Sequence, residues 1–143
     1  MAYSIRPATI TDIPHIVQHR AGMFREMGIP AAFEDMTAAT ELWLRHAIPS
    51  KTYLGWMAES NTGDVVAGGG LLIIPWPPGP ITMDPRCGFI FNVYTQPAHR
   101  KQGLAKRVMD AIQKVTGTKM KSQAAGKMGY TTSQIGDLVA EAL

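Results

Sequence analysis

A run of fifteen residues, Phe91 to Ala105, has the residue types and the spacing of a phosphate-binding segment. It begins with an apolar stretch typical of a buried strand, passes through a short polar loop and continues into an amphipathic helix. The N-terminus of a helix exposes unpaired N–H groups and carries a partial positive charge, and both favour a bound phosphate. Gly103 lets the main chain approach a ligand closely, and Ala105 keeps the next turn small. The local chemistry therefore predicts a pyrophosphate site at the start of this helix.

The positive charge of the chain gathers around the same loop. The formal net charge is only +3, but residues 1–98 hold six Lys or Arg against eight Asp or Glu, whereas residues 99–127 hold eight Lys or Arg against Asp110 alone. A basic surface of this kind suits a phosphate-bearing partner, either a nucleotide cofactor or a nucleic acid. No aromatic residue lies between Arg100 and Met128 to stack on bases, so we expect no nucleic acid partner.

The elements that must position this loop can be read from turn residues and apolar periodicity. In order, these predict a strand over residues 4–8 and a helix from Thr11 or Asp12 to just before Gly28. A second helix follows, with Met36, Ala39, Trp43 and Ala47 on one face, and ends before Pro49. Then come a hairpin of strands over 53–59 and 65–74, a strand over 88–94 and a helix from about Gln102. This order predicts a mixed α/β domain. Three glycines within the second hairpin strand, Gly68 to Gly70, indicate a bulge or a close approach of another element.

Length and composition predict a single domain over residues 1–143. The chain is 45% hydrophobic and 17% charged, which is enough to bury a core and unlike a disordered protein. No segment approaches the roughly 20 apolar residues needed to cross a bilayer, and no secretory leader is evident. The one cysteine, Cys87, excludes an internal disulfide and is interpreted as a small buried thiol. We expect a cytoplasmic protein with no membrane partner.

Metal binding is not expected. His15 and His19 lie one helical turn apart, but no Glu follows His15 and no third ligand is evident. The two histidines are therefore interpreted as ordinary helix residues. With Cys87 alone, no thiolate cluster can form.

The hexapeptide Arg100-Lys101-Gln102-Gly103-Leu104-Ala105 resembles a known pattern, (Arg or Gln)-x-x-Gly-x-(Gly or Ala), of the GNAT superfamily of N-acetyltransferases. Its place after a strand and before an amphipathic helix matches the family as well. The opening Ile5-Arg6-Pro7-Ala8 is similar to the start of many GNAT domains. The resemblance covers roughly residues 3–115 and implies a GNAT-like, mostly antiparallel sheet flanked by helices.

The resemblance also implies acetyl-CoA as a co-substrate. Main-chain amides of Gln102 to Lys106 would hold the pyrophosphate, and the main chain near Val93 would pair with the pantetheine arm like an added strand. The acetyl group would pass to a primary amine of a small molecule or peptide by direct attack. The cofactor-binding residues so implied are Asn92, Val93, Tyr94, Arg100, Lys101, Gln102, Gly103, Leu104, Ala105 and Lys106.

Such a reaction needs a base or a water chain for the amine proton and an acid for the leaving thiolate. The strand over residues 86–91 lacks the carboxylate that some family members place there, which leaves Glu59, or Asn92 with an ordered water, as the base. Where the family often has a tyrosine acid, this chain has Ala125. Tyr94 and Tyr130 are the substitute acids.

The C-terminal part of the chain departs from the family pattern. Residues 116–127 hold too little apolar sequence for the strand and helix that usually follow, so this part looks shortened. The alternative hypothesis is therefore a catalytically impaired GNAT-like module that binds CoA or a protein partner. The sequence leaves open both the acceptor amine and a homodimer.

Overall fold

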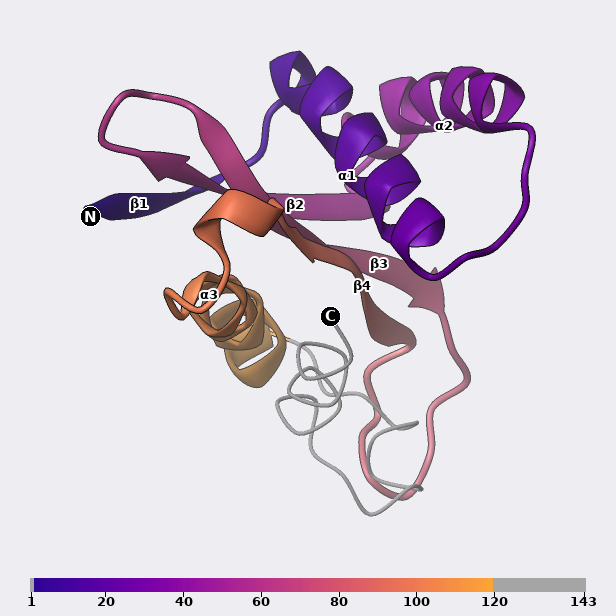
Figure 1. Ribbon diagram of the computed structural model, residues 1–143. Coiled ribbons are helices and arrows are strands. Elements are labelled where there is room, and N and C mark those ends of the chain that lie inside the picture. Colours follow the sequence, from indigo (N-terminus) through magenta and orange to yellow (C-terminus); the bar gives the residue numbers. More distant parts are fainter. Residues whose placement is uncertain (1, 120–143) are drawn as a thin grey trace.

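Four strands form one sheet in chain order, β1-β2-β3-β4, and each neighbouring pair is antiparallel (Figure 1). The computed structural model describes residues 2–119. Its elements are β1 (Tyr3–Pro7), the short 3-10 helix η1 (Ile10–Asp12), α1 (Ile13–Glu26), α2 (Phe33–Ala47), β2 (Tyr53–Ser60), β3 (Val65–Pro75), β4 (Arg86–Thr95), a second 3-10 helix η2 (Pro97–His99) and α3 (Leu104–Lys119). The predicted mixed α/β class and mostly antiparallel sheet are confirmed.

Local sequence explains where α1 starts and ends. The main-chain amide of Thr9 donates to Asp12 Oδ2 at 2.8 Å, an arrangement typical of a helix N-terminus. Pro14 lies in the first turn of α1, where its missing N–H breaks no helical hydrogen bond. Gly28, with a φ of +72°, ends the segment in a conformation that glycine adopts readily. The helix expected between Thr11 and Gly28 is therefore confirmed.

The second predicted helix, with Met36, Ala39, Trp43 and Ala47 on one face, corresponds to α2. It begins at Phe33, and Glu34 and Asp35 occupy its first turn, where carboxylates are favourable. The last helix begins at Leu104, after the predicted Gln102, because Gly103 has a φ of +76° that a right-handed helix excludes.

The helices cover both faces of the sheet. Figure 1 shows α1 and α2 together on one face and α3 on the other. Tyr53 and Met57 of β2 pack with α1 and α2 in one buried cluster, whereas Val93 of β4 packs with Leu104 and Val108 of α3 in another. The strands β2, β3 and β4 therefore divide their side chains between two cores, as the alternation of a strand requires.

The three glycines of β3 mark both of the features that the sequence suggested. The pairing of β3 with β4 shifts between Gly68 and Gly70, and β4 carries the extra residue. A Cβ built on Gly70 would lie 2.5 Å from the ring of Tyr53, and one on Gly69 would lie 2.8 Å from Val108 of α3. The sheet is thus approached closely on both faces.

The thiol of Cys87 is fully buried, as the sequence predicted. Across residues 2–119 every helix is too short or too polar to span a lipid bilayer.

Candidate functional site

The main chain of β4 leaves regular strand geometry at Asn92, whose φ is +56°. Phe91 pairs with Gly70 and Tyr94 pairs with Gly68, so that two residues of β4, Asn92 and Val93, lie opposite one residue of β3. This is a β-bulge, and asparagine tolerates its left-handed conformation better than most residues. The main-chain groups at the bulge are therefore turned out of the ladder with β3.

The bulge also decides which face each side chain reaches. The Asn92 side chain accepts a hydrogen bond from Arg20 of α1, and the Tyr94 ring packs against His19 of the same helix. Val93, between them, packs on the opposite face with Leu104, the first residue of α3. The bulge and the start of α3 therefore share one buried cluster.

The side chain of Asn92 is held firmly. It is only 5% exposed, and its Oδ1 accepts from Arg20 Nη1 at 2.6 Å. Burial raises the pKa of the Tyr53 hydroxyl to about 12, against a smaller lowering by a hydrogen bond with Asn92. Tyr53 is therefore a neutral phenol at pH 7.

A cavity of about 310 Å³ opens beside Asn92 and is lined by residues of α1, α2, β3 and β4. Its wall is mainly apolar and aromatic, with one cation. The lining includes Arg20, Met36, Trp43, Leu72, Phe91 and Asn92. Small-molecule sites are usually of this kind, with an apolar wall and a few fixed polar groups.

The loop before α3 has the geometry of an anion site. Lys101 and Gly103 have φ values of +64° and +76°, and a Cβ built on Gly103 would meet nothing within 4 Å. The first helical hydrogen bond runs from the Arg107 amide to the Gly103 carbonyl at 3.2 Å. In the described part of the chain, the amides of Leu104 to Lys106 precede that bond and have no main-chain partner. Unpaired amides at a helix N-terminus, beside the open space at Gly103, can hold an anion.

The basic side chains around this loop are not equally available. Arg100 donates to both carboxylate oxygens of Glu26, at 2.9 and 2.7 Å, and through Nε to the Thr95 carbonyl at 2.9 Å. Lys106 pairs with Asp110 at 3.0 Å. Lys101 is exposed and forms no ion pair within residues 2–119. Arg100 therefore fixes the loop, and Lys101 is the side chain free to meet a phosphate.

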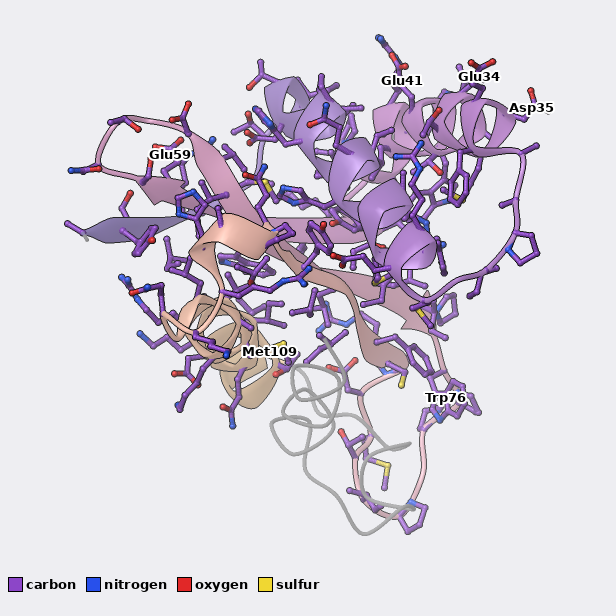
Figure 2. All side chains as sticks on the ribbon, in the orientation of Figure 1. Glu34, Asp35, Glu41, Glu59, Trp76 and Met109 are labelled. Carbon is purple, nitrogen blue, oxygen red and sulfur yellow. The ribbon has the colours of Figure 1, made fainter. Side chains whose placement is uncertain are left out.

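Glu59 is not brought to the bulge. Its carboxylate accepts from Arg6 Nε at 2.6 Å, and it pairs across the hairpin with Val65. Figure 2 shows it at the turn between β2 and β3. Val65 is the first residue of β3, whereas the bulge of β4 lies opposite Gly69, toward the middle of β3. Glu59 thus belongs to an ion-pair network at one end of the sheet, and we do not retain it as a candidate base.

Of the two candidate acids, Tyr94 is described and Tyr130 lies outside the described residues. Tyr94 is 8% exposed, and its hydroxyl lies against α1, where a Cβ on Gly22 would be 2.9 Å from it. The guanidinium of Arg100 lies 5.5 Å from its ring. The hydroxyl is therefore on the α1 face, as is the side chain of Asn92.

Two residues of α1 were not identified as functional candidates from the sequence. Arg20 contacts Asn92, and His19 is buried with neither ring nitrogen hydrogen-bonded. One signal for Arg20 was present, because it follows Ile16 and precedes Phe24 by four residues each and so falls on an inward-facing side of the helix. Among residues 2–119, no group of three His, Cys, Asp or Glu side chains is placed to hold a metal ion.

Comparison with known proteins gives one family and many similar structures. The sequence model of the acetyltransferase (GNAT) family matches residues 16–134. The crystal structure of a GCN5-related N-acetyltransferase from Ralstonia eutropha JMP134 is 32% identical in sequence, with a TM-score of 0.75 over 81% of this chain and 76% of that one. No curated protein matches the chain.

Two further solved structures share the fold at lower identity. A predicted acetyltransferase from Clostridium acetobutylicum, solved with acetyl-CoA, has a TM-score of 0.75 at 23% identity and covers 85% of this chain and 78% of that one. A ribosomal-protein-alanine N-acetyltransferase from Brucella melitensis biovar Abortus 2308 has a TM-score of 0.57 at 18% identity, over 81% and 72% of the two chains. These two likenesses concern the fold alone.

Proposed function

Because the chain belongs to the acetyltransferase (GNAT) family, we propose that it transfers the acetyl group of acetyl-CoA to a primary amine. One observation carries the proposal beyond family membership. Val93 of the β4 bulge belongs to the same buried cluster as Leu104, which directly follows the open, positive-φ loop before α3. The loop that suits an anion and the bulge of β4 are therefore held against the same buried core.

The residues present fit coenzyme A. The unpaired amides of Leu104 to Lys106 and the positive end of α3 suit a pyrophosphate, and the open space over Gly103 admits it. Lys101 supplies an uncommitted positive charge. β4 is the last strand of the sheet formed by residues 2–119, so its outer edge suits an extended arm added beside Asn92 and Val93.

The acetyl transfer proposed here joins the acceptor nitrogen to the acetyl carbon and breaks the bond from that carbon to sulfur. The amine loses a proton and the departing thiolate gains one. Main-chain groups of the bulge are our candidates to stabilise the charge that develops on the carbonyl oxygen. Asn92 cannot itself take a proton, so a water held beside it remains our candidate base, with Tyr94 or Tyr130 as the acid.

A second function is favoured by one observation. No Asp or Glu lines the cavity beside Asn92 within the described residues, so a carboxylate base is absent from that wall. A protein that binds CoA but does not transfer acetyl groups is the alternative. It predicts binding of acetyl-CoA without turnover on any amine.

Calorimetric titration with acetyl-CoA tests the site. Gly103→Glu should weaken binding at least tenfold, because it puts a bulky negative group where the pyrophosphate is expected. Gly63→Glu is the matched control, since Gly63 also has a positive φ, +85°, and open space around its Cα. It should bind as the wild type does. Equal binding by Gly103→Glu and wild type would contradict the assigned site.

Turnover separates the two functions. A thiol reagent can report the CoA released with an amine library, and background should be low because the one cysteine, Cys87, is buried. Amine-dependent CoA release supports the acetyltransferase, and binding without release supports the alternative.

A further inference from the structure

We propose that Arg20 binds a carboxylate of the acceptor, so that the substrates of this enzyme are small amines that also carry a carboxylate, such as amino acids with apolar side chains. This inference rests on the proposed acetyl transfer and names the class of acceptor. It follows from the surroundings of one guanidinium, from the wall of the cavity and from the place of both beside the bulge.

Arg20 lies half-buried among aromatic side chains. Its guanidinium carbon is 4.9 Å from the centre of the Phe24 ring and 5.7 Å from that of Phe91. One of its five N–H donors is used, by Asn92 Oδ1 at 2.6 Å. The rest have no hydrogen-bond partner within residues 2–119. Most of the donor capacity of this side chain is therefore left for a ligand.

The charge of Arg20 is not balanced by a neighbouring side chain. Arg6 and Arg100 are comparably exposed, and each donates to a carboxylate, Asp12 and Glu26 respectively. No carboxylate in the described part of the chain forms an ion pair with Arg20. Burial is the main influence on its pKa and lowers it, and Tyr53 opposes this lowering only in part. An arginine stays protonated nevertheless, so the cavity holds an unpaired positive charge.

The acidic side chains of α2 do not supply the missing partner. Figure 2 shows Glu34, Asp35 and Glu41 on the side of α2 that points away from the sheet. Glu41 is already paired with Arg45 at 2.7 Å. The cavity therefore carries a net positive charge, which favours an anionic ligand and opposes a polyamine or another polycation.

Apart from Arg20, Asn92 and Thr40, the lining of the cavity is apolar. Met36 and Trp43 of α2 and Leu72 of β3 line it, and the volume of about 310 Å³ is at the small end of the range for ligand pockets. A planar guanidinium fork matches a carboxylate, which can accept two parallel hydrogen bonds. A molecule of amino-acid size with an apolar side chain satisfies the charge, the wall and the volume together.

The anchor also lies where the reaction requires it. Arg20 contacts Asn92, the residue of the bulge where the proposed function places the acetyl group. A carboxylate held by Arg20 would keep the attached amine near that group, and the amine would remain outside the apolar wall. Fixing one end of the acceptor in this way lowers the entropy cost of attack.

Product binding tests the proposal without any turnover. N-acetyl-leucine, N-acetyl-methionine and N-acetyl-phenylalanine are titrated against the wild type beside their uncharged amides. At least one acid should bind about tenfold more tightly than its amide. Arg20→Gln should abolish the difference, and Arg20→Lys should keep part of it. Arg25→Gln is the matched control, because Arg25 is exposed on the same helix and does not line the cavity.

Each other outcome has a definite meaning. Acids and amides that bind equally, or none that binds at millimolar concentration, would overturn the proposal. A preference that survives Arg20→Gln in a protein of unchanged thermal midpoint would overturn the role of Arg20. Arg20-dependent acetylation of phosphoethanolamine, with none of amino acids, would assign the site to phosphate instead. A wild-type protein that does not bind acetyl-CoA would instead refute the proposed function itself.

Discussion

His19 and Arg20 are neighbours on α1, and their surroundings affect them in different ways. Arg20 stays charged and donates to Asn92, whereas His19 is 3% exposed and neither of its ring nitrogens has a hydrogen-bond partner. Burial lowers the pKa of His19 to about 4, with a smaller contribution from the charge of His15. At neutral pH the His19 imidazole is therefore uncharged and acts as packing between Gly68 and the Tyr94 ring.

This buried histidine predicts a loss of stability in mild acid. The unfolded chain binds the His19 proton near pH 6.5, whereas the folded protein resists it until about pH 4. The unfolded state therefore binds more protons in this window, and the free energy of unfolding should fall by up to about 3 kcal/mol as the pH drops through it. Urea unfolding at several pH values measures the slope.

Two variants identify the residue responsible for this slope. His19→Leu should flatten the profile between pH 6.5 and 4, because it removes the titrating ring and leaves an apolar side chain of similar size. His46→Gln, at an exposed histidine of α2, should leave the slope as in the wild type. The interpretation fails if both variants keep the wild-type profile.

At the level of elements, one ion-pair network joins β1, the turn before α1 and the end of β2. Arg6 donates to both carboxylate oxygens of Asp12 at 2.8 Å, and its Nε reaches Glu59 at 2.6 Å. Asp12 is 3% exposed and also accepts from the Thr9 amide. The Arg6 hydrogen bonds are the main reason that the pKa of Asp12 lies below its ordinary value of 3.8.

Removing the charge of Asp12 should therefore destabilise the fold. We expect Asp12→Asn to cost about 2 kcal/mol in urea unfolding at pH 7, less than a fully buried pair because Arg6 is partly exposed. Since a lowered carboxyl pKa stabilises only while the group is ionised, the difference from wild type should shrink as the pH falls below 3.8. Asp35→Asn, at an exposed site on α2, is the control and should cost far less. Similar costs for both variants would remove the network from the explanation.

The elements themselves were largely predictable because their signals are local. The apolar repeat of α1 and the turn between Ser60 and Val65 lie within short stretches of sequence, and both were placed correctly. The first residue of α3 was not, because a glycine in a loop does not reveal the sign of its φ. The sign of the Gly103 φ is set by the path of the folded loop between η2 and α3.

The candidate site was predictable only in part. The motif around Gly103 and the strand residue Asn92 were identified, since both belong to one continuous segment. Arg20 was missed because it meets Asn92 from 72 positions away, and no local pattern records such a contact. Glu59 was chosen for its chemistry, and only the folded structure shows that Arg6 already engages its carboxylate.

For the molecule as a whole, the sheet has a separate core on each face, and β3 is shared by both. Tyr53 and Met57 pack above it with α1 and α2, and Leu104 and Val108 pack below it with α3. The glycines of β3 make room for both layers. A substitution on β3 should therefore change the position of α3, whose N-terminus forms the proposed cofactor site.

Gly69→Ala tests this coupling across the molecule. The new Cβ would lie 2.8 Å from Val108 Cγ1 and 3.3 Å from both Ile112 Cδ1 and Val93 Cγ2, too close for a packed core. We expect a loss of about 1–3 kcal/mol in the free energy of unfolding, with weaker acetyl-CoA binding, because α3 must shift to relieve the overlap.

The partner substitution Val108→Ala removes the atom that the new Cβ would meet most closely. Alone it should also destabilise the protein, because it leaves a cavity between α3 and the sheet. Combined with Gly69→Ala it should cost less than the two single changes together, since the added methyl fills the space that the valine vacates. Urea unfolding of the four proteins gives the coupling energy. Strictly additive costs would mean that residues 69 and 108 are not coupled through the packing of α3 on β3. The affinity for acetyl-CoA would then have to be set by the loop around Gly103 alone.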